Sequence, residues 1–174
     1  MNKENPMQAP RLEKVVVSIS VGESGEKLVK AEKLLTKLTG RKPVRTVSKH
    51  KIPAWGLKKG EPIGCKVTLR GGKAAEFAKG ALSAKESMLQ PNNFDNAGNI
   101  SFGLNEYIDL PGIKYDPEIG IMGMNVNLTL ERPGYRIKRR RKQKTPIKPQ
   151  NKIIQKEAIE YMEKNFGVQI EQEN

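Results

Sequence analysis

Three segments alternate between apolar and polar residues, and this pattern constrains the fold more than any other feature. The segments are residues 14–21 (KVVVSISV), 65–71 (CKVTLRG) and 122–131 (MGMNVNLTLE). A period of two residues is typical of a β-strand with one face on a core and the other face open. The sequence therefore predicts a sheet that has a buried side and a polar side.

Apolar residues in three other segments recur with the spacing of an α-helix, namely in residues 26–39, 73–89 and 152–165. We expect Ser24 to cap the first of these helices and Asn151 to cap the last. A short strand at 43–49 has a long, hairpin-like connection to the strand at 63–70. This order predicts an α+β two-layer sandwich, with a mostly antiparallel sheet, helices on one face and an open second face.

The chain has 174 residues, which is enough for one domain with a core. We expect a single domain, 1–174, with a basic strand-connecting arm at 50–64 and a basic loop at 136–150 before the C-terminal helix. No run approaches the roughly 18 apolar residues of a membrane-spanning helix, and residues 1–14 lack the apolar stretch of a secretory signal. With one cysteine, these features predict a cytoplasmic protein without a membrane partner.

Positive charge is concentrated in two segments of the chain. The formal net charge is +13, and residues 41–73 hold ten Lys or Arg against one acid, Glu61. Residues 136–144 (RIKRRRKQK) hold seven basic side chains in nine positions. Segregated positive charge indicates a polyanionic partner such as nucleic acid or an anionic membrane surface. A protein that is basic without such a partner fits the clustering less well.

Groups for catalysis are scarce. His50 and Cys65 are the only residues of their kind, so a zinc site of the Cys/His type cannot be assembled. Residues 22–27 (GESGEK) lie between a strand and a helix, but they lack the spacing of a phosphate-binding loop and favour a plain turn. The carboxylates of 109–118 lie beside Pro and Gly, which is typical of turns. The sequence predicts neither an enzyme nor a cofactor.

Hydroxyls and cations share the outward face of two predicted strands. Ser18 and Ser20 belong to one strand, and Lys66, Thr68 and Arg70 belong to another. Hydroxyls can bind phosphates and ribose 2′-OH groups, while cations neutralise phosphate and displace its counterions. No aromatic residue shares this face, so base stacking is not expected. An ordinary solvated face is the alternative, but the nearby basic residues favour folded RNA.

The predicted arm and the basic run suggest further RNA contacts. The arm carries three lysines, Lys51, Lys58 and Lys59, around the only tryptophan, Trp55. The indole either anchors the arm on the core or stacks against a partner, and the sequence leaves both open. The run at 136–144 fits a nuclear address, a disordered tail or an RNA-bound loop. Its place between a strand and a helix favours an internal RNA-bound loop.

Five segments in order carry a family resemblance: PRLEKVVVSISVGE, LTGRKPVRTVSKHKI, GEPIGCKVTLRGGKAAEF, NFDNAGNISFGLNEY and GIKYDPEIGIMGMNV. They resemble the universal protein five family, the 5S-rRNA-binding proteins of the large ribosomal subunit. ERPGYRIKRRR and KEAIEYMEKNFGV are similar to its archaeal and eukaryotic branch. The resemblance covers nearly the whole chain.

The resemblance implies a non-enzymatic constituent of the cytoplasmic ribosome, located in the central protuberance. Its implied partners are 5S rRNA, large-subunit rRNA, P-site tRNA, other 5S-binding ribosomal proteins and a protein of the small-subunit head, to which it helps form a bridge.

Carried over by position, the implied 5S rRNA contacts are Ser18, Arg41, Lys42, Thr46, Lys49, Lys66, Thr68 and Arg70. The implied tRNA-contacting arm includes Lys51, Trp55, Lys58 and Lys59, and the further rRNA contacts are Arg136, Lys138, Arg139, Arg140 and Arg141. Bacterial members usually have Asn at the position of Ser18 and Gln at that of Arg41, so individual hydrogen bonds do not transfer. The alternatives are an RNA chaperone that binds through charge alone and a nucleotide-binding enzyme that uses Lys27.

Overall fold

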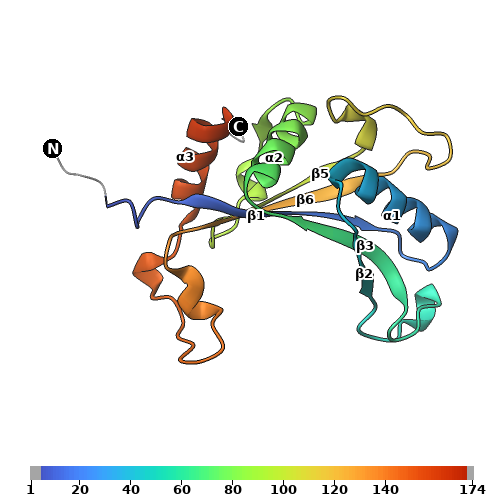
Figure 1. Ribbon diagram of the computed structural model, residues 1–174, viewed down its shortest axis with the longest axis horizontal. Coiled ribbons are helices and arrows are strands. Elements are labelled where there is room, and N and C mark those ends of the chain that lie inside the picture. Colours follow the sequence, from blue (N-terminus) through green and yellow to red (C-terminus); the bar gives the residue numbers. More distant parts are fainter. Residues whose placement is uncertain (1–4, 172–174) are drawn as a thin grey trace. The chain divides into compact units, whose positions relative to one another are not determined.

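A five-stranded sheet with the strand order β2-β3-β1-β6-β5 is the framework of the protein (Figure 1). The computed structural model describes residues 5–171. The strands of this sheet are β1 (Arg11–Ser20), β2 (Val44–Val47), β3 (Pro62–Leu69), β5 (Asn99–Leu104) and β6 (Met124–Glu131). The α-helices within the described residues are α1 (Glu26–Thr39), α2 (Gly72–Ala84) and α3 (Gln155–Phe166).

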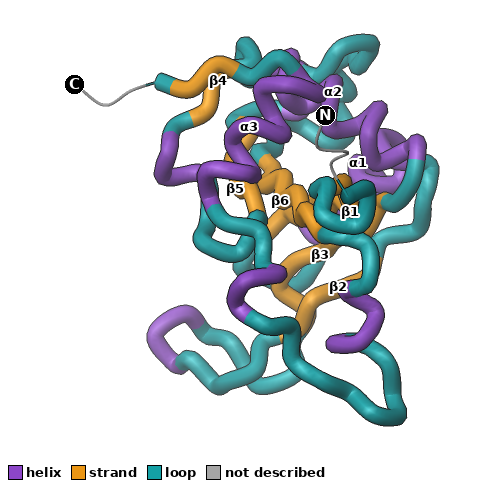
Figure 2. The backbone as a smooth tube through the Cα atoms, turned by 90° about the vertical axis from the view of Figure 1, so that its left-hand side faces the viewer, coloured by secondary structure: helices purple, strands orange, loops and turns teal. Residues whose placement is uncertain are grey.

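The sheet is mainly antiparallel. β2 and β3 form an antiparallel pair in which Arg45 lies opposite Cys65 and Thr46 lies opposite Gly64. The amides of Val21 and Gly22, just after β1, both donate to the carbonyl of Ile63 near the start of β3, at 3.0 and 2.9 Å. These elements confirm the predicted α+β sandwich. A second sheet pairs β4 (Met88–Leu89) with β7 (Gln169–Ile170) in parallel. β4 is labelled among the orange strands in Figure 2.

The chain packs as two compact units. Unit 1 comprises the described parts of Met1–Val15 and Asn127–Asn174 together with Arg70–Phe102, and unit 2 comprises Val16–Leu69 and Gly103–Val126. The core of unit 2 contains inward residues of the strands and of α1, among them Val17, Ile19, Leu34, Leu35 and Val67. The core of unit 1 contains Ala78, Leu82, Ile100, Leu128 and Met162, among others. Within unit 2, α1 packs on β3.

Helix α1 has the predicted apolar face and end, but not the predicted cap. Leu28, Leu34 and Leu35 are buried, and Gly40 takes the left-handed conformation (φ 62°), with its amide donating to the Thr36 carbonyl. The residue before the helix is Gly25, not Ser24. The Ser24 hydroxyl instead donates to Glu61 at 2.8 Å. The cap prediction was wrong because a residue distant in sequence competes for the hydroxyl.

The other two helices are shorter than expected. α2 ends at Ala84, because Glu86 and Ser87 have φ values of 56° and 57°, which no α-helix contains. α3 begins at Gln155 after Ile154, whose amide donates to Glu157 at 3.2 Å. Asn151 belongs to a separate 3₁₀ turn, so its predicted capping role was wrong.

Candidate nucleic-acid interface

One face of β1 and β3 in unit 2 is polar. Val17 and Ile19 of β1 and Val67 and Leu69 of β3 are buried, as alternation predicted. Residues of opposite parity therefore point to the other side: Ser18 and Ser20 from β1, and Lys66 and Thr68 from β3. Ser20, Lys66 and Thr68 are exposed and Ser18 is half-buried. We call these four residues and Thr46 the open face.

Thr46 joins this face through the register of β2 and β3. It lies opposite Gly64, and directly opposite residues of antiparallel strands point to the same side. A Cβ atom on Gly64 would lie 3.0 Å from the Thr46 hydroxyl oxygen and 2.7 Å from the Ile19 carbonyl oxygen. Glycine is required here because β1, β2 and β3 approach one another so closely that a Cβ would meet the Ile19 carbonyl oxygen and the Thr46 hydroxyl.

A shallow hollow of about 310 Å³ adjoins the two serines. Its lining includes Ser18, Ser20, Gly103, Asn105 and Asn125. Asn125 follows the alternation of β6 and is exposed. The residues implied by the family resemblance do not include Asn125, although the alternation in MGMNVNLTLE predicts that its side chain points outward. The hollow gathers hydroxyl and amide groups, which can donate to and accept from phosphate, ribose and base edges.

The remaining predicted 5S rRNA contacts of unit 2 do not all lie beside the open face. The Arg41 guanidinium donates to the Thr68 carbonyl at 3.4 Å, so Arg41 lies beside the open face. Lys49 is exposed just after β2. Lys42 lines a groove beside α1 and is not brought together with the open-face hydroxyls.

The arm between β2 and β3 comprises residues 48–61 rather than the predicted 50–64, because β2 ends at Val47 and β3 begins at Pro62. It is the turquoise loop beyond these strands in Figure 1. Ile52 and Leu57 exchange backbone hydrogen bonds at 3.0 and 3.1 Å around the 3₁₀ turn Pro53–Trp55. Leu57 is 6% exposed and Trp55 is 73% exposed. Leu57 is therefore the anchor, and Trp55 is presented to solvent.

The arm carries exposed lysines and one hydrogen-bonded acid. Lys51, Lys58 and Lys59 are exposed. Glu61 accepts hydrogen bonds from the Lys58 amide at 2.9 Å and from Ser24. The bond from the Lys58 amide, and after it the bond from Ser24, lowers the pKa of Glu61. The single acid of the basic segment thus holds the base of the arm in place.

In unit 1, Glu13 and Glu131 hold two of the predicted RNA-binding arginines. Arg70 donates to Glu13 at 2.9 Å, and Arg139 pairs with Glu13 and, at 2.7 Å, with Glu131. Both glutamate side chains are 8% exposed. Burial alone would raise the pKa of Glu13, but Arg70, Lys14 and Arg139 together lower it. Arg70 and Arg139 are therefore partly neutralised and position the chain around them.

The basic loop between β6 and α3 is anchored at Arg139 and at Tyr135. The Tyr135 hydroxyl donates to the Asn151 carbonyl at 2.7 Å, and Tyr135 is 9% exposed. Lys138 lies 5.4 Å from the centre of the Tyr135 ring. The remaining predicted rRNA contacts, Arg136, Arg140 and Arg141, are exposed or half-buried. Arg139 and Tyr135 therefore fix the loop to the rest of unit 1, and the other arginines remain accessible to solvent.

The nucleotide-site alternative gains no support from residues 22–27. Lys27 pairs with Glu23 at 2.6 Å, four residues earlier. Among the described residues, no three His, Cys, Asp or Glu side chains gather so that they could hold a metal ion. Within the same residues, no helix is both long and apolar enough to span a membrane.

Comparison with known proteins identifies relatives along almost the whole chain. A family model described as "Ribosomal protein L5" matches residues 5–58, and a second model, for the C-terminus of the same ribosomal family, matches residues 62–166. A "Large ribosomal subunit protein uL5" of Sulfurisphaera tokodaii is 52% identical over 167 residues, covering 95% of this chain and 94% of that protein. The proteins of the same name from Methanosphaera stadtmanae and Methanococcus aeolicus are 48% and 47% identical, with 96% and 98% of this chain covered and 99% and 96% of those proteins.

Proposed function

Because this chain belongs to the ribosomal protein L5 family and is therefore a structural constituent of the large ribosomal subunit in the cytoplasm, we propose that it binds 5S rRNA through the open face. The observation that carries this proposal is the composition of that face. It presents Ser18, Ser20, Thr46, Lys66 and Thr68, and none of these is a carboxylate or an aromatic residue. The family consists of ribosomal proteins rather than enzymes.

The chemistry of the open face suits the backbone of folded RNA. Lys66 neutralises phosphate, and the hydroxyls exchange hydrogen bonds with phosphate oxygens and ribose 2′-OH groups. Because no aromatic ring stands on this face, it recognises shape and backbone rather than unstacked bases. Arg41, beside Thr68, extends the set at its margin.

Further partners follow from the other basic segments. The anchored loop with Arg136, Lys138 and Arg141 contacts large-subunit rRNA. The exposed Trp55, with Lys58 and Lys59, contacts P-site tRNA. In the central protuberance the protein adjoins other 5S-binding proteins and helps form a bridge to a protein of the small-subunit head.

A competition experiment tests the 5S rRNA proposal. Labelled 5S rRNA is bound to the protein at near-physiological salt and challenged with excess tRNA. We expect the complex to resist tRNA, and Lys66→Ala with Thr68→Ala to weaken binding about tenfold, since each removes a polar contact worth about 0.5–1.5 kcal/mol or more. Lys79→Ala, an exposed lysine on α2, is the control and should change nothing.

Two outcomes would contradict the proposal. Equal displacement by tRNA would favour the alternative of an RNA chaperone that binds through charge alone. Unchanged affinity of the double variant, with the circular dichroism spectrum of the parent, would remove the open face from the binding site.

A further inference from the structure

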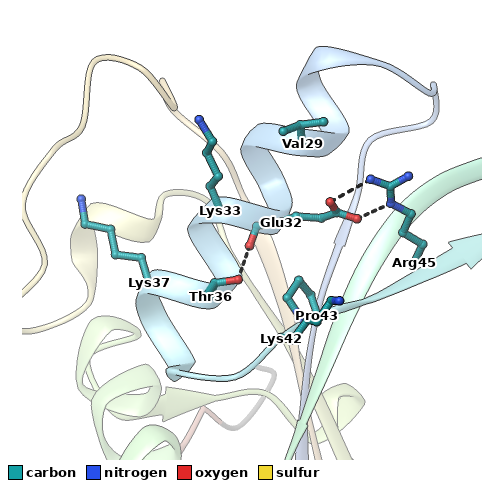
Figure 3. A pocket seen from close by; sticks show the side chains of 8 residues that line it. All are labelled: Val29, Glu32, Lys33, Thr36, Lys37, Lys42, Pro43 and Arg45. Carbon is teal, nitrogen blue, oxygen red and sulfur yellow. Dashed lines mark hydrogen bonds and ion pairs between the residues drawn. The ribbon is translucent and has the colours of Figure 1, made fainter.

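A second basic surface lies beside α1, where the proposed 5S rRNA site does not reach. A groove of about 730 Å³ runs between this helix and the chain that enters β2 (Figure 3). Its walls include Lys33 and Lys37 from α1 and Lys42 and Arg45 from the following segment. Arg45 lies opposite Cys65 and thus points to the helix-covered side of the sheet, away from the side of Thr46.

Two of the four cations in this groove are neutralised by neighbouring carboxylates. Arg45 makes hydrogen bonds to both carboxylate oxygens of Glu32, as Figure 3 shows, and Lys37 pairs with Asp116 at 2.8 Å. Lys33 and Lys42 make no direct ion pair among the described residues, but Lys33 helps to lower the pKa of Asp116 and Lys42 that of Glu32. The groove thus holds four cations against two carboxylates, and this leaves excess positive charge for an acidic ligand.

The groove also has apolar surface and an unpaired strand edge. Val29 and Pro43 line it, and Val29 is 44% exposed. β2 is the last strand of its sheet on this side. Its Val44 and Val47 are 62% and 54% exposed, and Val44, which lies opposite Lys66, points to the side of Thr46 rather than into the groove. An unpaired strand edge with exposed apolar side chains is a template on which an extended polypeptide can add as a further strand.

These features together favour a polypeptide over RNA. RNA would use the lysines but would gain nothing from Val29 and Pro43 in the groove or from the unpaired backbone edge of β2, and no aromatic residue lines the groove for stacking. We propose that the outer edge of β2 and the α1 groove bind an extended, acidic segment of a partner protein. The segment adds as a strand beside β2. Because side chains alternate along a strand, its apolar side chains cover Val44 on one face and its carboxylates reach Lys33 and Lys42 on the other. This proposal does not rest on 5S rRNA binding.

The test uses the full chain and fluorescein-labelled peptides of about ten residues, the length of a long strand. One peptide alternates Glu with Val, a second alternates Lys with Val, and a third replaces every second Val of the first by Pro. We expect only the Glu-Val peptide to bind, because the second has the wrong charge and the prolines of the third remove backbone donors and interrupt strand pairing. Binding should slow hydrogen exchange of amides within Val44–Val47.

Variants locate the peptide on this surface. Lys33→Glu with Lys42→Glu should weaken Glu-Val peptide binding about tenfold, because two attractive contacts become repulsive. Lys73→Glu with Lys79→Glu makes the same charge change at two exposed positions of α2 and should leave the affinity unchanged. If the double variant unfolds, Lys33→Gln with Lys42→Gln removes the charges without introducing repulsion, and it should still weaken binding.

Three results would overturn the proposal. The first is peptide affinity that neither pair of substitutions changes. The second is binding without protection of the Val44–Val47 amides, since this would leave charge attraction without strand addition. The third is an RNA duplex that competes with the peptide and protects the same amides, which would make the groove an RNA site.

Discussion

A single missing side chain determines how closely the strands behind the open face approach. A Cβ on Gly64 would meet the Ile19 carbonyl oxygen at 2.7 Å, a distance that only movement of the backbone can relieve. We expect Gly64→Ala to lower the free energy of unfolding by about 1–3 kcal/mol, as overpacking of a core typically does. Denaturant titration measures the change.

Gly72→Ala is the matched control for this residue. Gly72 is the first residue of α2, and a Cβ there would meet nothing within 4 Å. Because the same substitution reduces the entropy of the unfolded chain, Gly72→Ala should be neutral or stabilise the protein by about 0.4–1 kcal/mol. An equal decrease in the free energy of unfolding for both variants would show that the close approach of the strands at Gly64 does not cause the destabilisation.

Among the elements, the arm can be shortened without changing the open face, which separates the proposed tRNA contact from 5S rRNA binding. Ile52 and Leu57 form a hydrogen-bonded pair, which a two-residue Asn-Gly turn can connect. Replacing Pro53–Gly56 by Asn-Gly removes Trp55 and keeps buried Leu57. We expect 5S rRNA affinity to be unchanged and translation by ribosomes that carry the variant to be slower, because the P-site tRNA contact is lost.

Filter binding and an in vitro translation assay measure these two effects. Trp55→Ala alone is a milder variant, which leaves the turn in place. A loss of 5S rRNA affinity in the Asn-Gly variant would mean that the arm belongs to the 5S site. Normal translation by both variants would contradict the proposed contact between the arm and P-site tRNA.

For the whole molecule, the carboxylates determine how stability depends on pH. The pKa values of Glu13, Glu32, Glu61, Asp95 and Asp116 all lie below their ordinary values. A carboxyl group with a lowered pKa in the folded state contributes stability above its unfolded pKa, and this is lost as pH falls through the folded pKa. Protonation also increases a net charge that is already +13.

We therefore expect the melting temperature to change little between about pH 7 and 5 and to fall steeply below about pH 4.5, where ordinary Asp and Glu side chains begin to protonate. Thermal unfolding followed by circular dichroism across this range provides the measurement. Glu13→Gln should reduce the difference between neutral and acid pH, because it removes one of the contributing carboxylates. A melting temperature that rises on acidification would contradict this assignment.

Local patterns predicted a large part of the fold. Alternation predicted which side chains of β1, β3 and β6 are buried, and helical spacing predicted α1 from Leu28 to its end at Gly40. These patterns suffice because each residue's neighbours in sequence determine its side of the element. For the same reason, alternation predicted that Ser18, Lys66 and Thr68 lie together on the polar side of the sheet.

Contacts between distant residues could not be read in this way. Ser24 bonds to Glu61 rather than capping α1, and Arg70 pairs with Glu13, which lies 57 positions earlier. The sequence also could not decide between Trp55 and Leu57 as the anchor of the arm. The groove beside α1 was missed because its cations come from a helix and a strand that only the fold brings together.

Buried Cys65 has a practical consequence for experiments on this protein. It is 1% exposed, and burial raises the pKa of its thiol to about 11, so the reactive thiolate is nearly absent at neutral pH. Since it is the only cysteine in the chain, a new cysteine on the exposed arm would react with a maleimide dye while the native thiol stays intact. The wild-type core therefore permits single-site fluorescent labelling without a cysteine-free background.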